Sequence, residues 1–64
     1  MEFNKKLRTA REMAGISRSD LAMRIGVSLA TINRWEYGET EPSVSQIVEL
    51  ANVLEKEILY FFTS

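Results

Sequence analysis

The sequence predicts an all-α fold, a compact arrangement of five short helices. Apolar residues recur at spacings of three and four between the chain's three glycines and single proline, and this is the period of one helix face. No segment alternates apolar and polar residues as a half-buried strand does. Serines precede three of the apolar segments, where a side-chain oxygen can cap the first turn of a helix.

The first two helices are marked at both ends. The first is expected over residues 3–14, because its apolar residues lie at spacings of four, three and four: Phe3, Leu7, Ala10 and Ala14. Gly15 follows as a left-handed stop. Ser17 is expected to cap the second helix, with Asp20 completing a start that resembles a capping box. That helix ends at Gly26.

The remaining helices follow the same logic. Ser28 caps a third helix that ends at Gly38, and Trp35 shares its inward face with Ile32, so we expect Trp35 in the core. Ser43 caps a fourth helix, whose apolar face consists of Ile47, Leu50, Ala51 and Leu54. Residues 57–62 form a last short segment with five consecutive large apolar residues.

Composition limits the function. The chain has 64 residues, 45% of them apolar, which is typical of one small globular domain. It contains no cysteine, no histidine and no glycine-rich phosphate loop. We therefore expect no disulfide, no metal site and no cofactor, and no enzyme or small-molecule substrate. No apolar run approaches the about 20 residues of a membrane span, so a cytoplasmic location is expected.

Charge is unevenly distributed along the chain. Residues 1–34 carry seven bases and three acids, whereas residues 35–64 carry one base and six acids. This asymmetry predicts a basic face that can meet an anion. Residues 18–37 contain the elements of a helix-turn-helix: a small residue for the helix crossing, a glycine for the turn and a branched residue to hold the second helix, namely Ala22, Gly26 and Ile32.

The sequence resembles the Cro/phage-repressor (lambda-repressor-like) helix-turn-helix family over about residues 3–62. The most specific match is Trp35-Glu36-x-Gly38-x-x-x-Pro42-Ser43. Supporting matches are Leu7-x-x-x-Arg11-Glu12-x-x-Gly15-Ile16-Ser17 and Leu21-Ala22-x-x-Ile25-Gly26-Val27-Ser28, followed by Thr31-Ile32-x-Arg34. The resemblance implies one five-helix domain over residues 1–64 that binds an operator in double-stranded DNA. It also implies a repressor-like transcriptional regulator, bacterial or phage-encoded, nucleoid-associated and usually dimeric.

The resemblance also assigns roles to residues. The third helix, residues 28–37, would enter the major groove, with base contacts from Ser28, Leu29, Ala30, Asn33 and Arg34. Arginine can pair with guanine through two hydrogen bonds, and asparagine with adenine. Relatives hold phosphates at the positions of Ser17, Arg18, Thr31 and Tyr37. They also form a partly buried salt bridge at the positions of Arg11 and Glu36.

Two departures keep alternatives open. Residues 39–41 read Glu-Thr-Glu, where relatives often carry bases, and Arg18 stands where glutamine is frequent. The acidic loop allows a second interpretation, a protein-interaction module of the same fold with weak or lost DNA binding. The apolar C-terminal segment predicts a homodimer interface at Leu59 and Tyr60, with Ile58 and Phe61 facing inward beside Leu54. The alternative is a monomer cut from a longer chain whose further residues cover this patch.

Overall fold

The computed structural model describes residues 2–63, which form four α-helices followed by one 3₁₀ helix. Their bounds are α1 Phe3–Ala14, α2 Arg18–Ile25, α3 Leu29–Tyr37, α4 Val44–Leu54 and η1 Ile58–Phe62. The predicted all-α class is confirmed, with a 3₁₀ helix as its fifth member. Within residues 2–63, no helix is long and apolar enough to cross a membrane. Met1 and Ser64, part of the predicted domain, lie outside the described residues.

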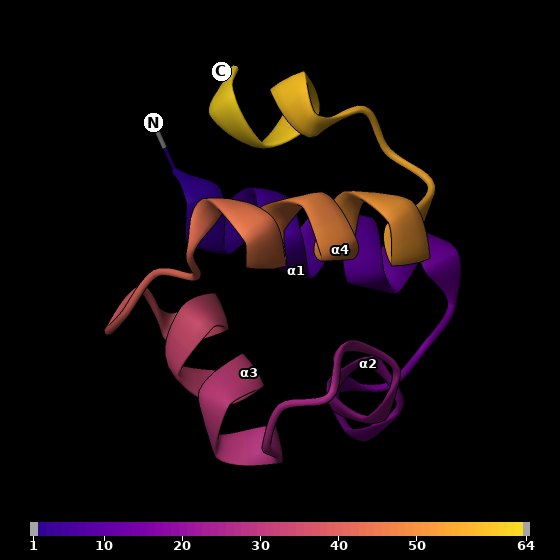
Figure 1. The fold of residues 1–64 in the computed structure, drawn as a ribbon, viewed down its shortest axis with the longest axis vertical. Coiled ribbons are helices and arrows are strands. Elements are labelled where there is room, and N and C mark those ends of the chain that lie inside the picture. The colour runs from indigo at the N-terminus through magenta and orange to yellow at the C-terminus, as the bar shows by residue number, and fades with distance from the viewer. Residues whose placement is uncertain (1, 64) are drawn as a thin grey trace.

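Helices α1 and α4 form the middle of the molecule. They lie side by side, with α2 and α3 on one side of them and η1 on the other (Figure 1). The first and last elements meet, since the rings of Phe3 and Phe61 are 5.6 Å apart between centroids. The α2–α3 pair and the C-terminal segment therefore occupy opposite sides of the α1–α4 pair.

Local signals place most helix ends where they were predicted. The N-caps of α2, α3 and α4 each accept a hydrogen bond from the N–H three residues further on, and they are the expected serines Ser17, Ser28 and Ser43. The left-handed C-caps of the first three helices are the expected glycines Gly15, Gly26 and Gly38. These caps satisfy backbone groups that a helix leaves without partners at its ends.

The capping box predicted for α2 is only half formed. Ser17 accepts from the Asp20 N–H at 3.0 Å, but the Asp20 carboxylate pairs with Arg24 one turn further on, with Oδ2 3.3 Å from Nη2. Aspartate is one methylene shorter than the usual glutamate, which disfavours the return bond to the cap. At α4 the box is complete, because the Ser43 N–H also donates to Gln46 Oε1 at 2.8 Å.

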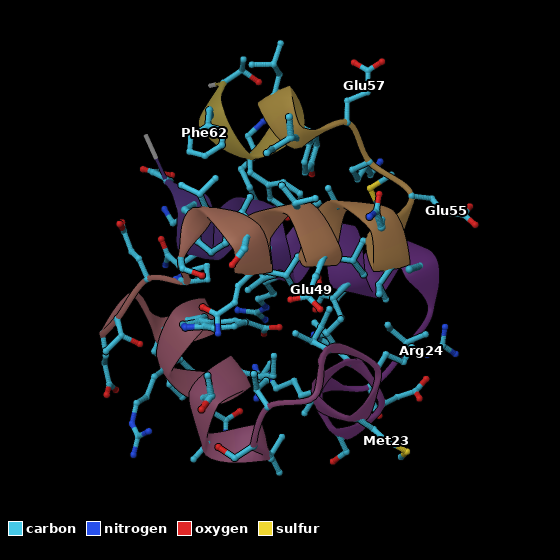
Figure 2. All side chains as sticks on the ribbon, viewed as in Figure 1. Met23, Arg24, Glu49, Glu55, Glu57 and Phe62 are labelled. Atoms are coloured by element: carbon cyan, nitrogen blue, oxygen red, sulfur yellow. The ribbon has the colours of Figure 1, made fainter. Side chains whose placement is uncertain are left out.

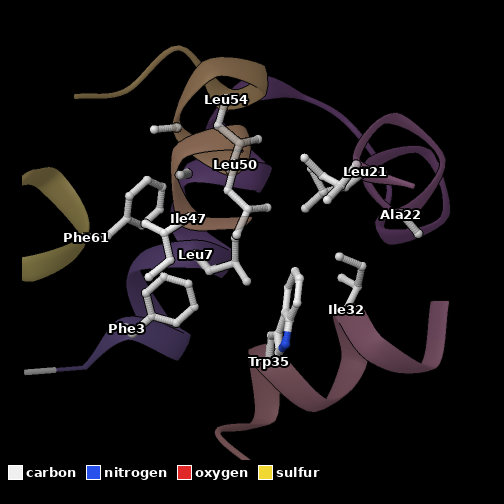
Figure 3. Packing of buried hydrophobic residues seen from close by; sticks show 13 residues of the cluster. Phe3, Leu7, Leu21, Ala22, Ile32, Trp35, Ile47, Leu50, Leu54 and Phe61 are labelled. Atoms are coloured by element: carbon white, nitrogen blue, oxygen red, sulfur yellow. The ribbon is translucent and has the colours of Figure 1, made fainter. Parts of the chain in front are cut away.

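One apolar core joins all five elements. Figure 3 shows side chains from every helix converging on one centre. The most deeply buried large residues are Leu7, Leu21, Ile32, Leu50 and Phe61. Trp35 is buried among them, as expected, and Ala22 of α2 is buried as well. The core therefore holds the α2–α3 unit against the rest of the domain.

The orientation predicted for η1 is partly wrong. Phe61 is fully buried and Leu59 is 65% exposed, as expected. Ile58, however, is 36% exposed, because it only begins the 3₁₀ helix where the chain arrives from α4. Tyr60 is half-buried rather than outward, with its ring edge-on to Phe61 at 5.2 Å. The ammonium groups of Lys6 and Lys56 lie 4.6 and 4.9 Å from the Tyr60 ring centroid, and these cation–π contacts favour the inward position.

Candidate nucleic-acid interface

Helix α3 has one buried face and one exposed face. Its inward face carries Ile32, Trp35 and Glu36, all buried. Leu29, Ala30, Arg34 and Tyr37 are exposed. Exposed leucine and alanine at the start of the helix provide apolar surface of the kind that contacts thymine methyl groups.

The turn before α3 presents this face at a steep angle to α2. Figure 1 looks along the axis of α2, whereas α3 lies across the view. Gly26 has φ 82°, a conformation that glycine adopts without a steric cost. The N–H of Val27 then donates to the Ala22 carbonyl at 3.0 Å, and Val27 packs against the core. The predicted helix-turn-helix geometry over residues 18–37 is therefore present.

A buried carboxylate fixes the far end of α3. The Glu36 side chain is 0% exposed, and its Oε2 lies 2.6 Å from Arg11 Nε. Arg11 also donates from Nη2 to Glu36 Oε1 at 3.3 Å and from Nη1 to the Ile16 carbonyl at 3.0 Å. The expected Arg11–Glu36 pair therefore joins α1, the α1–α2 connection and α3.

Arg18 is a second partner of the same carboxylate, which the sequence did not indicate. Its Nε donates to Glu36 Oε1 at 3.0 Å, and its guanidinium carbon lies 5.5 Å from the centroid of the Tyr37 ring. The hydrogen bond and the charge of Glu36 raise the pKa of the Arg18 guanidinium above its ordinary value. No sequence spacing pairs residues 18 and 36, which come together only because α2 crosses α3.

Arg34 differs from every other arginine of the chain, all of which lie in the described part. Arg8, Arg11, Arg18 and Arg24 each pair with a carboxylate. Arg34 is exposed and makes no such pair with any residue from 2 to 63. Its charge on the outer face of α3 is therefore available to a ligand.

The other predicted contacts on α3 are more constrained. Ser28 Oγ lies 2.9 Å from Thr31 Oγ1 and also accepts from the Thr31 N–H, so both hydroxyls have partners within the helix. Asn33 is half-buried, and its Oδ1 is buried without a hydrogen-bond partner among the described residues. Pairing with adenine requires both amide atoms, so Asn33 must change rotamer before it can read that base in this way.

The remaining predicted positions lie in three places. Ser17 stands at the N-terminus of α2, beside Arg18, where the first N–H groups of the helix favour an anion. Glu39 and Glu41 are exposed in the loop after α3. Leu59 and Tyr60 lie on η1, beyond α1 and α4 from this face (Figure 1). The structure thus gathers the predicted phosphate and base positions on α2 and α3 and separates them from the predicted dimer contact.

Comparisons with known proteins agree with this geometry. The pattern of the helix-turn-helix family matches residues 7–61. A crystal structure of the P22 c2 repressor in complex with a synthetic operator superposes with a TM-score of 0.85 and 29% identity, covering 92% of this chain and 89% of that one.

Two curated relatives are similar in sequence. An HTH-type transcriptional regulator from Haemophilus influenzae is 42% identical over 45 residues, which are 70% of this chain and 19% of the relative. A transcriptional regulator in the ATPase CF(0) region of Rhodospirillum rubrum is 34% identical over 59 residues, which are 92% of this chain and 55% of the relative. The chain thus spans between about a fifth and about half of these relatives.

Proposed function

The chain belongs to the helix-turn-helix family, and from this premise we propose that it is a sequence-specific regulator of transcription that binds double-stranded DNA. Helix α3 enters the major groove, with the outer-face residues Leu29, Ala30 and Arg34 at base edges. The observation that carries the proposal is the unpaired Arg34 on the exposed face of a supported helix. The likeness to a repressor in complex with its operator supports the same function.

Base contacts from Ser28 and Asn33 complete the proposed reading surface. The Ser28 hydroxyl faces the groove while it caps α3, and Asn33 donates or accepts after a rotamer change. Phosphates are held beside the start of α2 by Ser17 and Arg18, and beside α3 by Thr31. DNA is the single ligand of this surface, and the protein acts where duplex DNA is found, in the cytoplasm.

Two subunits on a two-fold operator are part of the proposal. Leu59, Phe62 and Ile58 form exposed apolar surface on η1, and such surface on a small protein often marks an interface. Tyr60 lies beside them and is half-buried, so it contributes less exposed surface. An operator with half-sites one turn of DNA apart would place the two recognition helices about 34–36 Å from each other.

Duplexes selected from a random library test the function. Replacing Arg34 with Ala should weaken binding to the preferred duplex by about 1–3 kcal/mol and relax preference at one base pair. Arg24→Ala is the matched control, because Arg24 is exposed and points away from α3 (Figure 2). Equal affinities for the parent and both variants on every duplex would show that the assigned face does not bind DNA.

The alternative, a protein-interaction module, is favoured by one observation, the exposed acidic pair Glu39 and Glu41 beside α3. Carboxylates at this point repel phosphates. A mobility-shift assay on random duplex at low salt separates the two functions, because nonspecific DNA binding is strongest there. A chain that shifts no duplex under these conditions is the interaction module.

A further inference from the structure

The guanidinium of Arg18 is bonded at Nε and lies over the Tyr37 ring, while its outer edge is partly exposed. Its Nε bonds to Glu36, and the Tyr37 ring lies beside it at 5.5 Å. The Tyr37 hydroxyl also raises the pKa of Arg18, after Glu36, but the only side-chain hydrogen bond that Arg18 forms within residues 2–63 is the one from Nε, and the side chain is 32% exposed. The open edge of a guanidinium is the edge that forms two parallel bonds with the oxygens of a phosphate.

The charges around this group leave one positive charge without a partner. Glu36 supplies a single carboxylate to both Arg11 and Arg18. Arg11 uses its three donor nitrogens on Glu36 and on the Ile16 carbonyl. The unmatched charge therefore lies on Arg18, at the N-terminus of α2, where free N–H groups also favour an anion.

Tyr37 is not part of the apolar core, so packing does not explain its position. It is the last residue of α3, 62% exposed and outside the apolar core. Its described partner is the Arg18 guanidinium, whose carbon lies 5.5 Å from the Tyr37 ring centroid; the Tyr37 hydroxyl adds a smaller contribution than Glu36 to the raised pKa of Arg18. An exposed aromatic ring beside a cation restricts where that cation points.

We propose that Tyr37 is a positioning residue for Arg18 rather than a phosphate ligand itself: its ring, with Glu36, holds the guanidinium so that its open edge receives one DNA phosphate. The inference rests on the proposed DNA binding and refines the family-based expectation for Tyr37. A long side chain that is already ordered loses less conformational entropy on binding. The ring therefore raises affinity without touching the DNA.

Three single variants and two doubles test the role of the ring, by fluorescence anisotropy on the selected duplex over a range of salt. Arg18→Ala should weaken binding and lower the salt slope by about one. Tyr37→Leu should lower affinity about twofold to tenfold, the size of one ordered side chain, with an unchanged slope. Tyr37→Phe, which keeps the ring and removes the hydroxyl, should keep most of the parent affinity, because the hydroxyl contributes less than Glu36 at Arg18. In the Arg18→Ala background, Leu and Phe at position 37 should bind alike.

The outcomes separate this inference from the function on which it rests. If Tyr37→Phe loses as much affinity as Tyr37→Leu, and does so without Arg18, the hydroxyl contacts phosphate directly and the inference is wrong while DNA binding stands. If Arg18→Ala has no effect on a parent that binds DNA, the inference is also wrong. A parent that binds no duplex removes both. Thermal melting of each variant serves as the folding control, since Tyr37 lies outside the core.

Discussion

Helices α3 and η1 both expose apolar side chains but are held in different ways. Each buries one aromatic side chain, Trp35 or Phe61, and exposes a leucine, Leu29 or Leu59. Helix α3 has a side-chain cap at its start, a glycine cap at its end and a buried ion pair to α1. Helix η1 has no side-chain bond at its N-cap, Glu57, and depends on packing.

This difference in support suits the two helices to different kinds of contact. Hydrogen bonds and ion pairs are directional, so they fix the rotation of α3 about its axis and the positions of its outward side chains. Reading base edges requires such fixed positions. Apolar packing is less directional, and an apolar contact between subunits tolerates a helix held by one buried ring.

Replacing Phe61, the buried side chain of η1, should have the largest effect on stability. Phe61→Ala should lower the free energy of unfolding by about 3–5 kcal/mol, because it leaves a cavity beside Phe3 in the core. Chemical denaturation followed by circular dichroism measures the change. Phe62→Ala is the control, and the exposed ring of Phe62 should cost about 1 kcal/mol or less. Equal losses would mean that η1 is not held by Phe61.

Breaking the ionic cluster of α3 should have a smaller effect. Glu36→Gln should cost about 2–3 kcal/mol, because Arg11 loses its counter-charge while the amide keeps the size and one acceptor of the carboxylate. Partial exposure of Arg18 limits the loss. Glu12→Gln breaks the exposed pair with Arg8 and should change stability by less than about 0.5 kcal/mol. A loss no larger for Glu36→Gln than for this control would show that the cluster does not stabilise α3.

The smallest effect on stability is expected for the exposed Leu59 of η1. Leu59→Glu should change the free energy of unfolding by less than about 0.5 kcal/mol, yet prevent association, because it places a charge against its own copy. Sedimentation with and without DNA measures association. Met23→Glu, an exposed residue on α2 (Figure 2), is the matched control. Tyr60 is left unchanged, since its half-buried ring packs on Phe61.

Two results would contradict the proposed interface. A parent that stays monomeric at high concentration and on DNA does not use η1 for self-association. A Leu59→Glu variant that still dimerises places the interface on another surface. Loss of association in Met23→Glu as well would point to a general charge effect.

Most local structure could be predicted from the sequence. Serine caps and glycine stops act within one or two turns of chain, so Ser28 and Gly38 marked the ends of α3 directly. The end of α4 was less visible. There Glu55 takes the left-handed conformation at φ 56°, which non-glycine residues seldom adopt. The sequence contains no glycine or asparagine at this position that would predict the end of the helix.

The candidate site was predicted in its location and less well in its contacts. The family resemblance indicated α3 and the Arg11–Glu36 pair, which the structure contains. It did not indicate that Arg18 shares the Glu36 carboxylate or lies beside Tyr37. It also did not indicate that the Asn33 oxygen is buried without a partner. These features depend on side-chain rotamers set by neighbours on other helices.

By itself, then, the sequence determined the helices, their caps and the apolar face of each, because the period of a helix and the chemistry of its ends are local properties. Tertiary structure alone decided which charges meet and which rings are covered. Glu36 meets Arg18 across 18 positions of chain only after α2 and α3 cross. Tyr60 is half-buried because its ring contacts Lys6 of α1, Lys56 of the connection from α4, and Phe61.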